Sequence, residues 1–419
     1  MRICIFEDEE YENLYPLSLT RPVFELKCGQ FTLRERILRN FSGVDVSYFM
    51  RDYLVPVFSQ DKKEVSVNEM QALKNDDILF INGRWLLSKG ELNLTGEEEV
   101  GICGEETLYL RVKRKTMKTY FSSSFRKLIS SLKQKLKKKE IKARLVTYPW
   151  DLIINNSWAL EEDFTFRSNE GVQGKFSSQV VIYGDRNKIF VAKSAKIQPL
   201  VFLDCTEGPI YIDEEALIFA HTHIKGPSYI GKKSQILGAH IGEGTSIGPV
   251  CRVGGEVEET IIHGFTNKAH QGFFGHSYLG EWINIGALCT NSDLKNDYSS
   301  VQLYIEGKLK DSGITKVGSF IGDHTKLGIG CLLNTGTIVG VGSNIVTAGK
   351  VLPKFIPSFT WCLNGKFYKG YGLKQIIETA KVVMSRRKVT MSPEEIKMLE
   401  EVFKITEKER EKLIEKSKR

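Results

Sequence analysis

The chain has 419 residues, of which 41% are hydrophobic, so it can form two or three domains that each bury a core. No apolar run reaches the roughly 18 residues of a membrane-spanning helix. The first ten residues have the pattern of a strand and an acidic loop rather than of a signal peptide. We therefore expect a cytoplasmic protein that has no membrane partner.

The net charge of +8 arises largely from a basic segment, residues 111–144. This segment lacks the interleaved aromatic side chains on which nucleic-acid bases stack, so it predicts a helix with a solvent-exposed basic face and no nucleic-acid partner. The eight cysteines have no short paired spacing, which argues against a disulfide framework or a zinc knot. All seven histidines, in contrast, lie between residues 221 and 324, and this clustering indicates chemistry there.

Residues 1–157 predict an α/β domain. Buried strands are expected at 3–6, 44–50 and 77–81, and a helix is expected at 32–38. Strands that alternate with helices favour a parallel sheet, whose ligands bind beyond the carboxyl ends of the strands. Asn82 directly follows the last of these strands, so it is a candidate binding residue.

After a connecting segment at 158–188, residues 189–360 predict a solenoid. An apolar residue falls at every sixth position, and Gly often follows it, as in Ile230-Gly231 and Ile247-Gly248. This hexapeptide repeat is typical of a parallel β-helix, in which each aliphatic side chain points into a narrow prism. The repeated positions are Ile212, Ile218, Ile224, Ile230 and Ile236, then after one shorter step Ile241, Ile247 and Val253, and in a second run Ile321, Leu327, Leu333, Val339, Ile345 and Val351.

The irregular segment 264–298 interrupts the solenoid and is rich in His, Lys, Asn and Asp. Because each regular repeat adds stability, a polar interruption predicts the position of the functional site. Residues 361–419 predict helices, one at 373–388 and another after the capping box Ser392–Glu395, followed by a basic tail.

Four motifs follow the first strand: Pro16-Leu17, Thr20-Arg21-Pro22, Glu25-Leu26-Lys27-Cys28-Gly29 and Thr32-Leu33-Arg34-Glu35-Arg36. In these motifs the chain resembles the GlmU-like sugar nucleotidyltransferases, and the similarity extends over most of the chain. The resemblance implies a Rossmann-like nucleotidyltransferase domain that uses Mg²⁺, with Arg21 and Lys27 on the phosphates. Two departures stand out, because Glu7–Glu10 replaces a Gly-rich phosphate loop and Asn82 replaces a metal-binding Asp. The metal ligands are therefore unknown, and a domain retained only as a scaffold is an alternative.

The solenoid resembles the left-handed β-helix of hexapeptide acyltransferases in the stretches Ile247–Arg252, Asn267–His270, His276–Gly280 and Asn284–Ala287. Acetyl transfer to an amino sugar needs a base whose pKa lies near the working pH, which a histidine provides. The resemblance implies His276 as this base and His270 as its competitor, because extra residues between the two motifs let either one align. It also implies phosphate ligands Arg252 and Lys268, sugar ligands Tyr278, Asn284, Asn291 and Lys295, and contacts of Ala287 and Ala348 with acetyl-CoA.

The leading hypothesis is a bifunctional enzyme, a sugar-1-phosphate nucleotidyltransferase and amino-sugar-1-phosphate N-acetyltransferase that makes UDP-N-acetylglucosamine. The resemblance further implies a homotrimer, because family sites lie between subunits. One alternative is a nucleotidyltransferase alone, with a structural solenoid. A second is a hexapeptide metalloenzyme similar to γ-type carbonic anhydrase, which His221 and His223 invite, and a purely structural trimer is a third.

Overall fold

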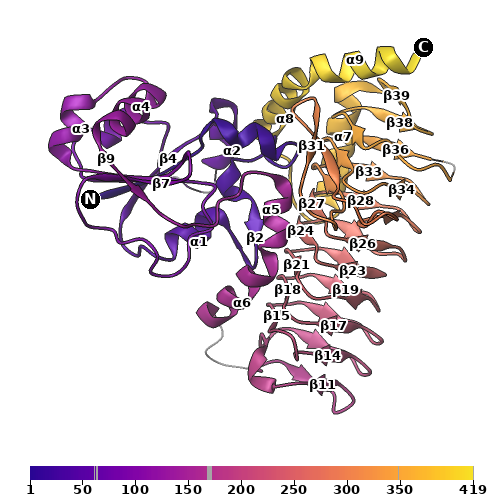
Figure 1. Cartoon of the computed structure of the whole chain (residues 1–419). Helices are drawn as coiled ribbons and strands as arrows, with labels where there is room; N and C mark the ends of the chain where they lie inside the picture. Colours follow the sequence, from indigo (N-terminus) through magenta and orange to yellow (C-terminus); the bar gives the residue numbers. More distant parts are fainter. Residues whose placement is uncertain (61, 63–64, 168–171, 348, 419) are drawn as a thin grey trace. The chain divides into compact units, whose positions relative to one another are not determined.

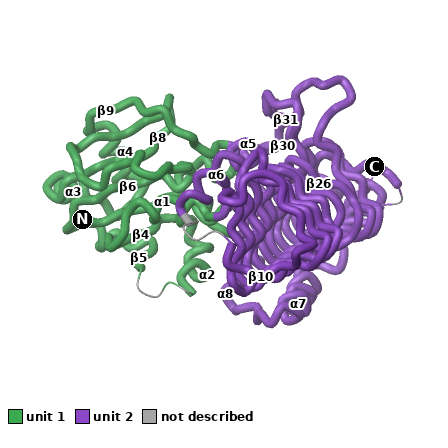
Figure 2. Tube along the Cα trace, turned by 90° about the horizontal axis from the view of Figure 1, so that it is seen from below, with its two compact units in different colours: residues 1–14, 21–26, 31–147 green, residues 15–20, 27–30, 148–419 purple. Residues whose placement is uncertain are grey.

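The computed structural model describes residues 1–60, 62, 65–167, 172–347 and 349–418, and these form two compact units (Figure 2). The first unit comprises Met1–Leu14, Arg21–Leu26 and Phe31–Thr147. The second comprises Tyr15–Thr20, Lys27–Gln30 and Tyr148–Arg419. Parts of the motifs near the N-terminus thus belong to the same unit as the solenoid.

The first unit is an α/β domain around a seven-stranded sheet. Its order is β5 (Ser66–Val67), β4 (Asp45–Phe49), β1 (Arg2–Phe6), β6 (Ile78–Asn82), β8 (Glu106–Val112), β7 (Glu99–Cys103) and β9 (Lys137–Glu140). Strands β1, β4, β5 and β6 are parallel, as the sequence predicts, whereas β8 runs antiparallel to β6 and β7. The carboxyl ends of β1 and β6 therefore meet at one edge, where Phe6 pairs with Asn82.

The helices of the first unit are short. They are α1 (Leu33–Leu38), α2 (Val55–Phe58), α3 (Arg114–Tyr120) and α4 (Phe125–Lys135). Thr32 and Glu35 form a capping box that fixes the start of α1. The basic segment 111–144 is not one helix, because Ser124 caps a new helix after α3 and the chain then enters β9.

The second unit is a parallel β-helix built from three long sheets (Figure 1). Sheet one contains β12 (Ile189–Val191), β15 (Ile210–Ile212), β18 (Ser228–Ile230), β21 (Thr245–Ile247), β24 (Ile261–Gly264), β27 (Tyr278–Glu281), β32 (Phe320–Ile321), β35 (Ile338–Val339) and β37 (Phe355–Ile356). Sheet two contains β10 (Lys175–Phe176), β13 (Lys196–Ile197), β16 (Leu217–Ile218), β19 (Gln235–Ile236), β22 (Arg252–Val253), β25 (Asn267–Lys268), β28 (Asn284–Ile285), β33 (Lys326–Leu327), β36 (Asn344–Val346), β38 (Trp361–Leu363) and β39 (Lys366–Tyr368). Sheet three contains β11 (Val181–Tyr183), β14 (Phe202–Asp204), β17 (His223–Lys225), β20 (His240–Ile241), β23 (Glu256–Glu258) and β26 (Phe273–Gly275).

The six-residue repeat places apolar side chains in the interior of the solenoid. Ile212, Ile230, Ile247 and Ile262 stack in register on successive strands of sheet one, and all four are fully buried. Each such side chain contributes about 2 kcal/mol through removal from water. The predicted parallel β-helix is confirmed, and the predicted connecting segment 158–188 already contains its first two strands, β10 and β11.

Helices and short strands complete the second unit. Its helices are α5 (Pro149–Ile154), α6 (Asn156–Arg167), α7 (Gly372–Ser385), α8 (Pro393–Ile405) and α9 (Glu407–Lys418), and its short strands are β2 (Lys27–Cys28), β29 (Thr290–Asn291), β30 (Gln302–Ile305), β31 (Lys308–Asp311) and β34 (Leu332–Leu333). The short strand β3 (Phe31–Thr32) belongs to the first unit. The predicted capping box of α8 is present at Ser392 and Glu395. Within the described part of the chain, no helix is long and apolar enough to cross a membrane.

Candidate active site

The solenoid continues through the first part of the predicted irregular segment, where four residues connect β25 to β26, as in the regular coils. Lys268 stands in register with the inward-pointing Val253 and is 1% exposed. Its ammonium donates to the carbonyl oxygens of Gly254 (2.7 Å), His270 (2.9 Å) and Gly272 (2.7 Å). Burial lowers the pKa of Lys268 to about 8, but three donated hydrogen bonds use all three hydrogens of the charged form. Lys268 therefore holds the turn between β25 and β26 together from inside, and these contacts leave no hydrogen of its ammonium for the predicted phosphate.

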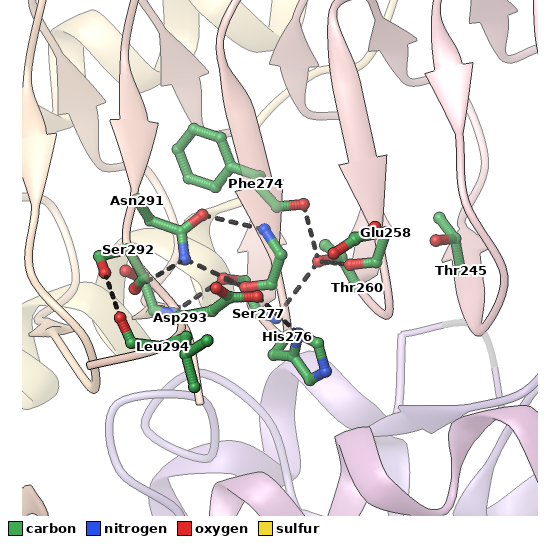
Figure 3. A network of polar contacts seen from close by, with 12 residues as sticks. Thr245, Glu258, Thr260, Phe274, His276, Ser277, Asn291, Ser292, Asp293 and Leu294 are labelled. Atoms are coloured by element: carbon green, nitrogen blue, oxygen red, sulfur yellow. Dashed lines mark hydrogen bonds and ion pairs between the residues drawn. The ribbon is translucent and has the colours of Figure 1, made fainter. Parts of the chain in front are cut away.

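His276 lies at the corner where the chain leaves β26 and enters β27. Its backbone is left-handed (φ 47°), its N–H donates to Glu258 O (3.2 Å), and its carbonyl accepts from Gly318 N (2.9 Å). Its Nδ1 lies 2.8 Å from Asp293 Oδ2 (Figure 3). A carboxylate that accepts the Nδ1 hydrogen leaves the Nε2 lone pair available, which is the arrangement of an oriented general base.

Carboxylates surround this histidine. Glu258, His276 and Asp293 come from successive coils, and their ligand atoms all lie within 4.8 Å of one another. Burial raises the pKa of Glu259, and the negative charges of Glu243 and Glu258 raise it further, whereas His276 and Lys316 lower it. The corner is thus an acidic environment, suited to a cationic group such as a protonated amine or a metal ion.

Asn291 supports this corner from within. It is 3% exposed, its Oδ1 accepts from Gly275 N (3.0 Å), and its Nδ2 donates to Gly275 O (3.0 Å). Both groups of the amide therefore fasten the end of β26 to the next coil. The predicted contact of Asn291 with a sugar does not fit this geometry, although the residue does lie beside His276.

Tyr278 lies two residues beyond His276 but is fully buried on sheet one. Its hydroxyl accepts from Lys27 N (2.9 Å) and lies 2.9 Å from His263 Nδ1. No exposed surface is left for a sugar, so the predicted role of Tyr278 does not fit the structure. Its observed role is to anchor the segment Lys27–Gln30.

The other predicted residues of the solenoid lie on other strands or contact other partners. Arg252 and Asn284 are on sheet two, where Asn284 Oδ1 accepts from Asn267 Nδ2 (2.8 Å). The ammonium of Lys295 donates to Ser299 Oγ (2.9 Å) and Ser300 O (2.5 Å) in the insertion after β29. Ala287 lies between β28 and β29, and Ala348 is outside the described residues.

His270 is exposed on the turn between β25 and β26. Among the described residues, its carbonyl accepts from Lys268, while its ring makes no hydrogen bond or ion pair of the kind that orients His276. Of the two histidines, only His276 is therefore positioned by a carboxylate. The spacing carried a signal for this, since Asp293 follows His276 by 17 residues, the same interval as one coil from Ile230 to Ile247.

The predicted phosphate ligands of the N-terminal region are buried. Arg21 is 8% exposed, and its carbonyl accepts from Arg51 Nη2 (3.0 Å). Lys27 is also 8% exposed; its ammonium donates to Gln30 O (3.1 Å) and lies 5.8 Å from the ring centre of Tyr229 on the solenoid. Lys27 therefore serves the packing of the second unit, which does not fit the prediction of a phosphate ligand.

A cavity of about 980 Å³ opens at the carboxyl edge of the sheet in the first unit. One part of its lining is acidic and another part is basic and apolar, and the lining includes Glu7, Asp8, Glu9, Glu10, Glu105, Glu106, Phe125, Arg126, Ile129, Lys133 and Lys138. Asn82 is fully buried behind it, where its Nδ2 donates to Asp8 Oδ2 (2.7 Å) and Thr107 O (2.8 Å). The cavity thus lies at the carboxyl ends of the strands, where the sheet topology predicts a ligand site.

Known proteins match parts of this chain. Residues 3–171 match the family model described as sugar nucleotidyl transferase. A bifunctional sugar-1-phosphate nucleotidylyltransferase/acetyltransferase of Sulfurisphaera tokodaii is 30% identical over 197 residues, which cover 47% of this chain and 43% of the relative. The chain is thus similar to GlmU-like sugar nucleotidyltransferases, and the family model covers its N-terminal residues 3–171.

Further matches extend this GlmU-like similarity. The bifunctional protein GlmU of Thermodesulfovibrio yellowstonii is 29% identical over 133 residues, which cover 31% of this chain and 26% of the relative. The matches thus span less than half the length of these curated relatives. Among solved structures, the UDP-N-acetylglucosamine acyltransferase of Francisella novicida matches 58% of this chain and 89% of its own, at 15% identity and a TM-score of 0.32.

Proposed function

We propose that the protein is a bifunctional transferase that makes UDP-N-acetylglucosamine from glucosamine 1-phosphate, acetyl-CoA and UTP. The observation that carries the acetyl-transfer half is the His276–Asp293 pair on a hexapeptide solenoid, at 2.8 Å. The similarity to a bifunctional nucleotidylyltransferase/acetyltransferase supports the combination of the two activities. The nucleotidyl-transfer half is supported by the family match of residues 3–171 and by the cavity at the carboxyl edge of the sheet.

In acetyl transfer, the amine nitrogen of the sugar attacks the thioester carbonyl of acetyl-CoA, and the thiol of coenzyme A leaves. His276 Nε2 would take the proton that the amine loses, and Asp293 would stabilise the imidazolium that forms. The acidic surroundings suit an acceptor that arrives as an ammonium ion. His270 is the weaker candidate, because no described carboxylate orients its ring.

In nucleotidyl transfer, a phosphate oxygen of the sugar 1-phosphate attacks the α-phosphorus of UTP, and pyrophosphate leaves. We propose Mg²⁺ as the cofactor of this half, because a metal ion neutralises the charge of a triphosphate. Arg126, Lys133 and Lys138 line the cavity and would supply positive charge to the phosphates. We therefore propose Arg126, Lys133 and Lys138 as the phosphate ligands, in place of Arg21 and Lys27.

We also propose a homotrimer in the cytoplasm. His276 lies at the corner between β26 and β27, whereas Ala287 lies at a different corner, between β28 and β29. A base and an acetyl-CoA contact on different corners of one prism suit a site that two neighbouring copies complete. Arg252 and Asn284, on the face of sheet two, would be substrate contacts in the same way.

The experiment that tests this function measures two products from wild-type protein. Thiol release from acetyl-CoA on addition of glucosamine 1-phosphate supports acetyl transfer, and pyrophosphate release from UTP on addition of N-acetylglucosamine 1-phosphate supports nucleotidyl transfer. Pyrophosphate release without thiol release would favour the alternative of a nucleotidyltransferase that has a structural solenoid.

A second candidate function is a hexapeptide metalloenzyme. The observation that favours it is the group Glu258, His276 and Asp293, whose ligand atoms are close enough to hold one ion. His221 and His223 do not belong to this group. Metal analysis of purified protein tests the candidate, since a stoichiometric zinc ion that is lost in His276→Ala would favour it over acetyl transfer.

A further inference from the structure

Arg84 occupies the carboxyl edge of the central strands in the first unit. It follows β6 by two residues and is 0% exposed. Its Nε donates to Asp8 Oδ1 (2.8 Å) and its Nη2 to Asp8 Oδ2 (2.6 Å), so the two groups form a bidentate pair. Nη2 also donates to Glu106 Oε2 (2.8 Å) and Nη1 to Val146 O (3.0 Å). The guanidinium therefore sits as a fixed cation between two carboxylates.

Asn82 belongs to the same network. Its Oδ1 accepts from the backbone N–H of Arg84 (2.9 Å), and its Nδ2 donates to Asp8 Oδ2 and Thr107 O. The amide therefore turns its hydrogens, not its oxygen, toward Asp8. Every polar atom of the Asn82 side chain is used inside the domain.

These contacts decide whether the carboxyl edge of β1 and β6 can hold a Mg²⁺ ion. Mg²⁺ takes about six oxygen ligands in near-octahedral geometry and is held in such sites through one or two carboxylates. Both oxygens of Asp8 already accept from Arg84, Asn82 Oδ1 is taken, and a guanidinium lies between Asp8 and Glu106. A divalent cation placed there would meet strong repulsion from this buried charge. The residues at this edge do not fit a resident Mg²⁺.

We propose that Arg84 takes the place of a resident divalent cation at the carboxyl edge of β1 and β6. The proposal deepens the nucleotidyl-transfer half of the proposed function and rests on it for its catalytic meaning. Any Mg²⁺ that this half uses then enters bound to the nucleotide and is not ligated by Asp8 or Asn82. Arg84 is a positioning residue, because it holds the two carboxylates and neutralises them without touching the cavity itself.

The test is a titration with Mn²⁺ and no nucleotide, followed by the electron paramagnetic resonance signal of the free ion. Wild type and Asp8→Asn should bind Mn²⁺ equally. Arg84→Met should bind one additional ion, because it leaves Asp8 and Glu106 without their cation, and Arg84→Met/Asp8→Asn should lose that ion again. Arg111→Met is the matched control, since it breaks a buried pair with Glu99 elsewhere on the sheet and should gain no ion.

Two results would overturn the proposal. One is weaker Mn²⁺ binding in Asp8→Asn than in wild type, which would reveal a resident metal site that depends on Asp8. This comparison needs no Arg84 variant, so it stands even where Arg84→Met fails to fold. The other is a folded Arg84→Met that gains no ion. Because the readout is metal binding, a failure of nucleotidyl transfer would leave these results unchanged and would count against the proposed function alone.

Discussion

The corner around His276 and the cavity of the first unit are both candidate sites, yet their side chains are used differently. At the corner, a histidine and carboxylates from successive coils converge on a partly exposed point. In the first unit, polar side chains at the carboxyl edge of the sheet are occupied by contacts within the domain, as in the pair of Arg84 with Asp8. The comparison teaches that a motif residue of the correct type is a ligand only where the fold leaves its polar atoms free.

The largest effect on stability is expected from Lys268→Met. Three carbonyl oxygens in the solenoid interior would lose a charged donor, so the free energy of unfolding should fall by about 3 kcal/mol. Denaturant unfolding monitored by circular dichroism measures this change. Lys295→Met is the control and should change the value by less than about 0.5 kcal/mol, since the ammonium of Lys295 donates to Ser299 and Ser300 in the insertion after β29. Equal stability of the two variants would show that Lys268 is not a structural cation.

An intermediate effect is expected from Asp293→Asn. The amide cannot accept the Nδ1 hydrogen of His276 in the same way as the carboxylate, so the rate of thiol release should fall by about 10- to 30-fold with little change in KM. Steady-state kinetics with acetyl-CoA and glucosamine 1-phosphate measure both constants, and pyrophosphate release in the same preparation is the control. A change in KM alone would assign Asp293 to substrate binding and not to orientation of the base.

The smallest effect is expected from Lys27→Met. Because the ammonium of Lys27 donates to Gln30 O within the second unit, the KM for UTP should change by less than about threefold. Kinetics of pyrophosphate release measure it, with Lys133→Met as the comparison, since Lys133 lines the cavity. A rise of tenfold or more in the KM for UTP in Lys27→Met would indicate that Lys27 is a phosphate ligand. The contrast between the two regions would then not hold.

Much of the fold could be predicted, because the physical constraint repeats along the chain. The inward positions of a narrow prism favour apolar side chains, so spacing alone predicts that Ile230 and Ile247 point into the core. Lys268 breaks this rule: the six-residue spacing from Ile262 to Lys268 and Phe274 places it inward, but the sequence does not reveal the carbonyl oxygens that accept its hydrogens. The burial of Tyr278 likewise depends on Lys27, which is 251 residues away along the chain.

The candidate site was predictable in part for the same reason. His276 could be named from its motif, and its partner Asp293 could have been found one coil later. The role of Arg84 could not be predicted from the sequence. It depends on Asp8 and Glu106, which contact Arg84 only after strands β1, β6 and β8 have paired. Local motifs thus locate a site, whereas long-range contacts decide which side chains remain available in it.

The central claim is that His276 is the base of acetyl transfer. The most direct test measures thiol release from acetyl-CoA with glucosamine 1-phosphate in wild type, His276→Ala and His270→Ala, alongside pyrophosphate release. The account predicts a loss of about 10³-fold in thiol release for His276→Ala, unchanged pyrophosphate release, and a His270→Ala variant within about twofold of wild type. Thiol release that survives in His276→Ala but is lost in His270→Ala would contradict it.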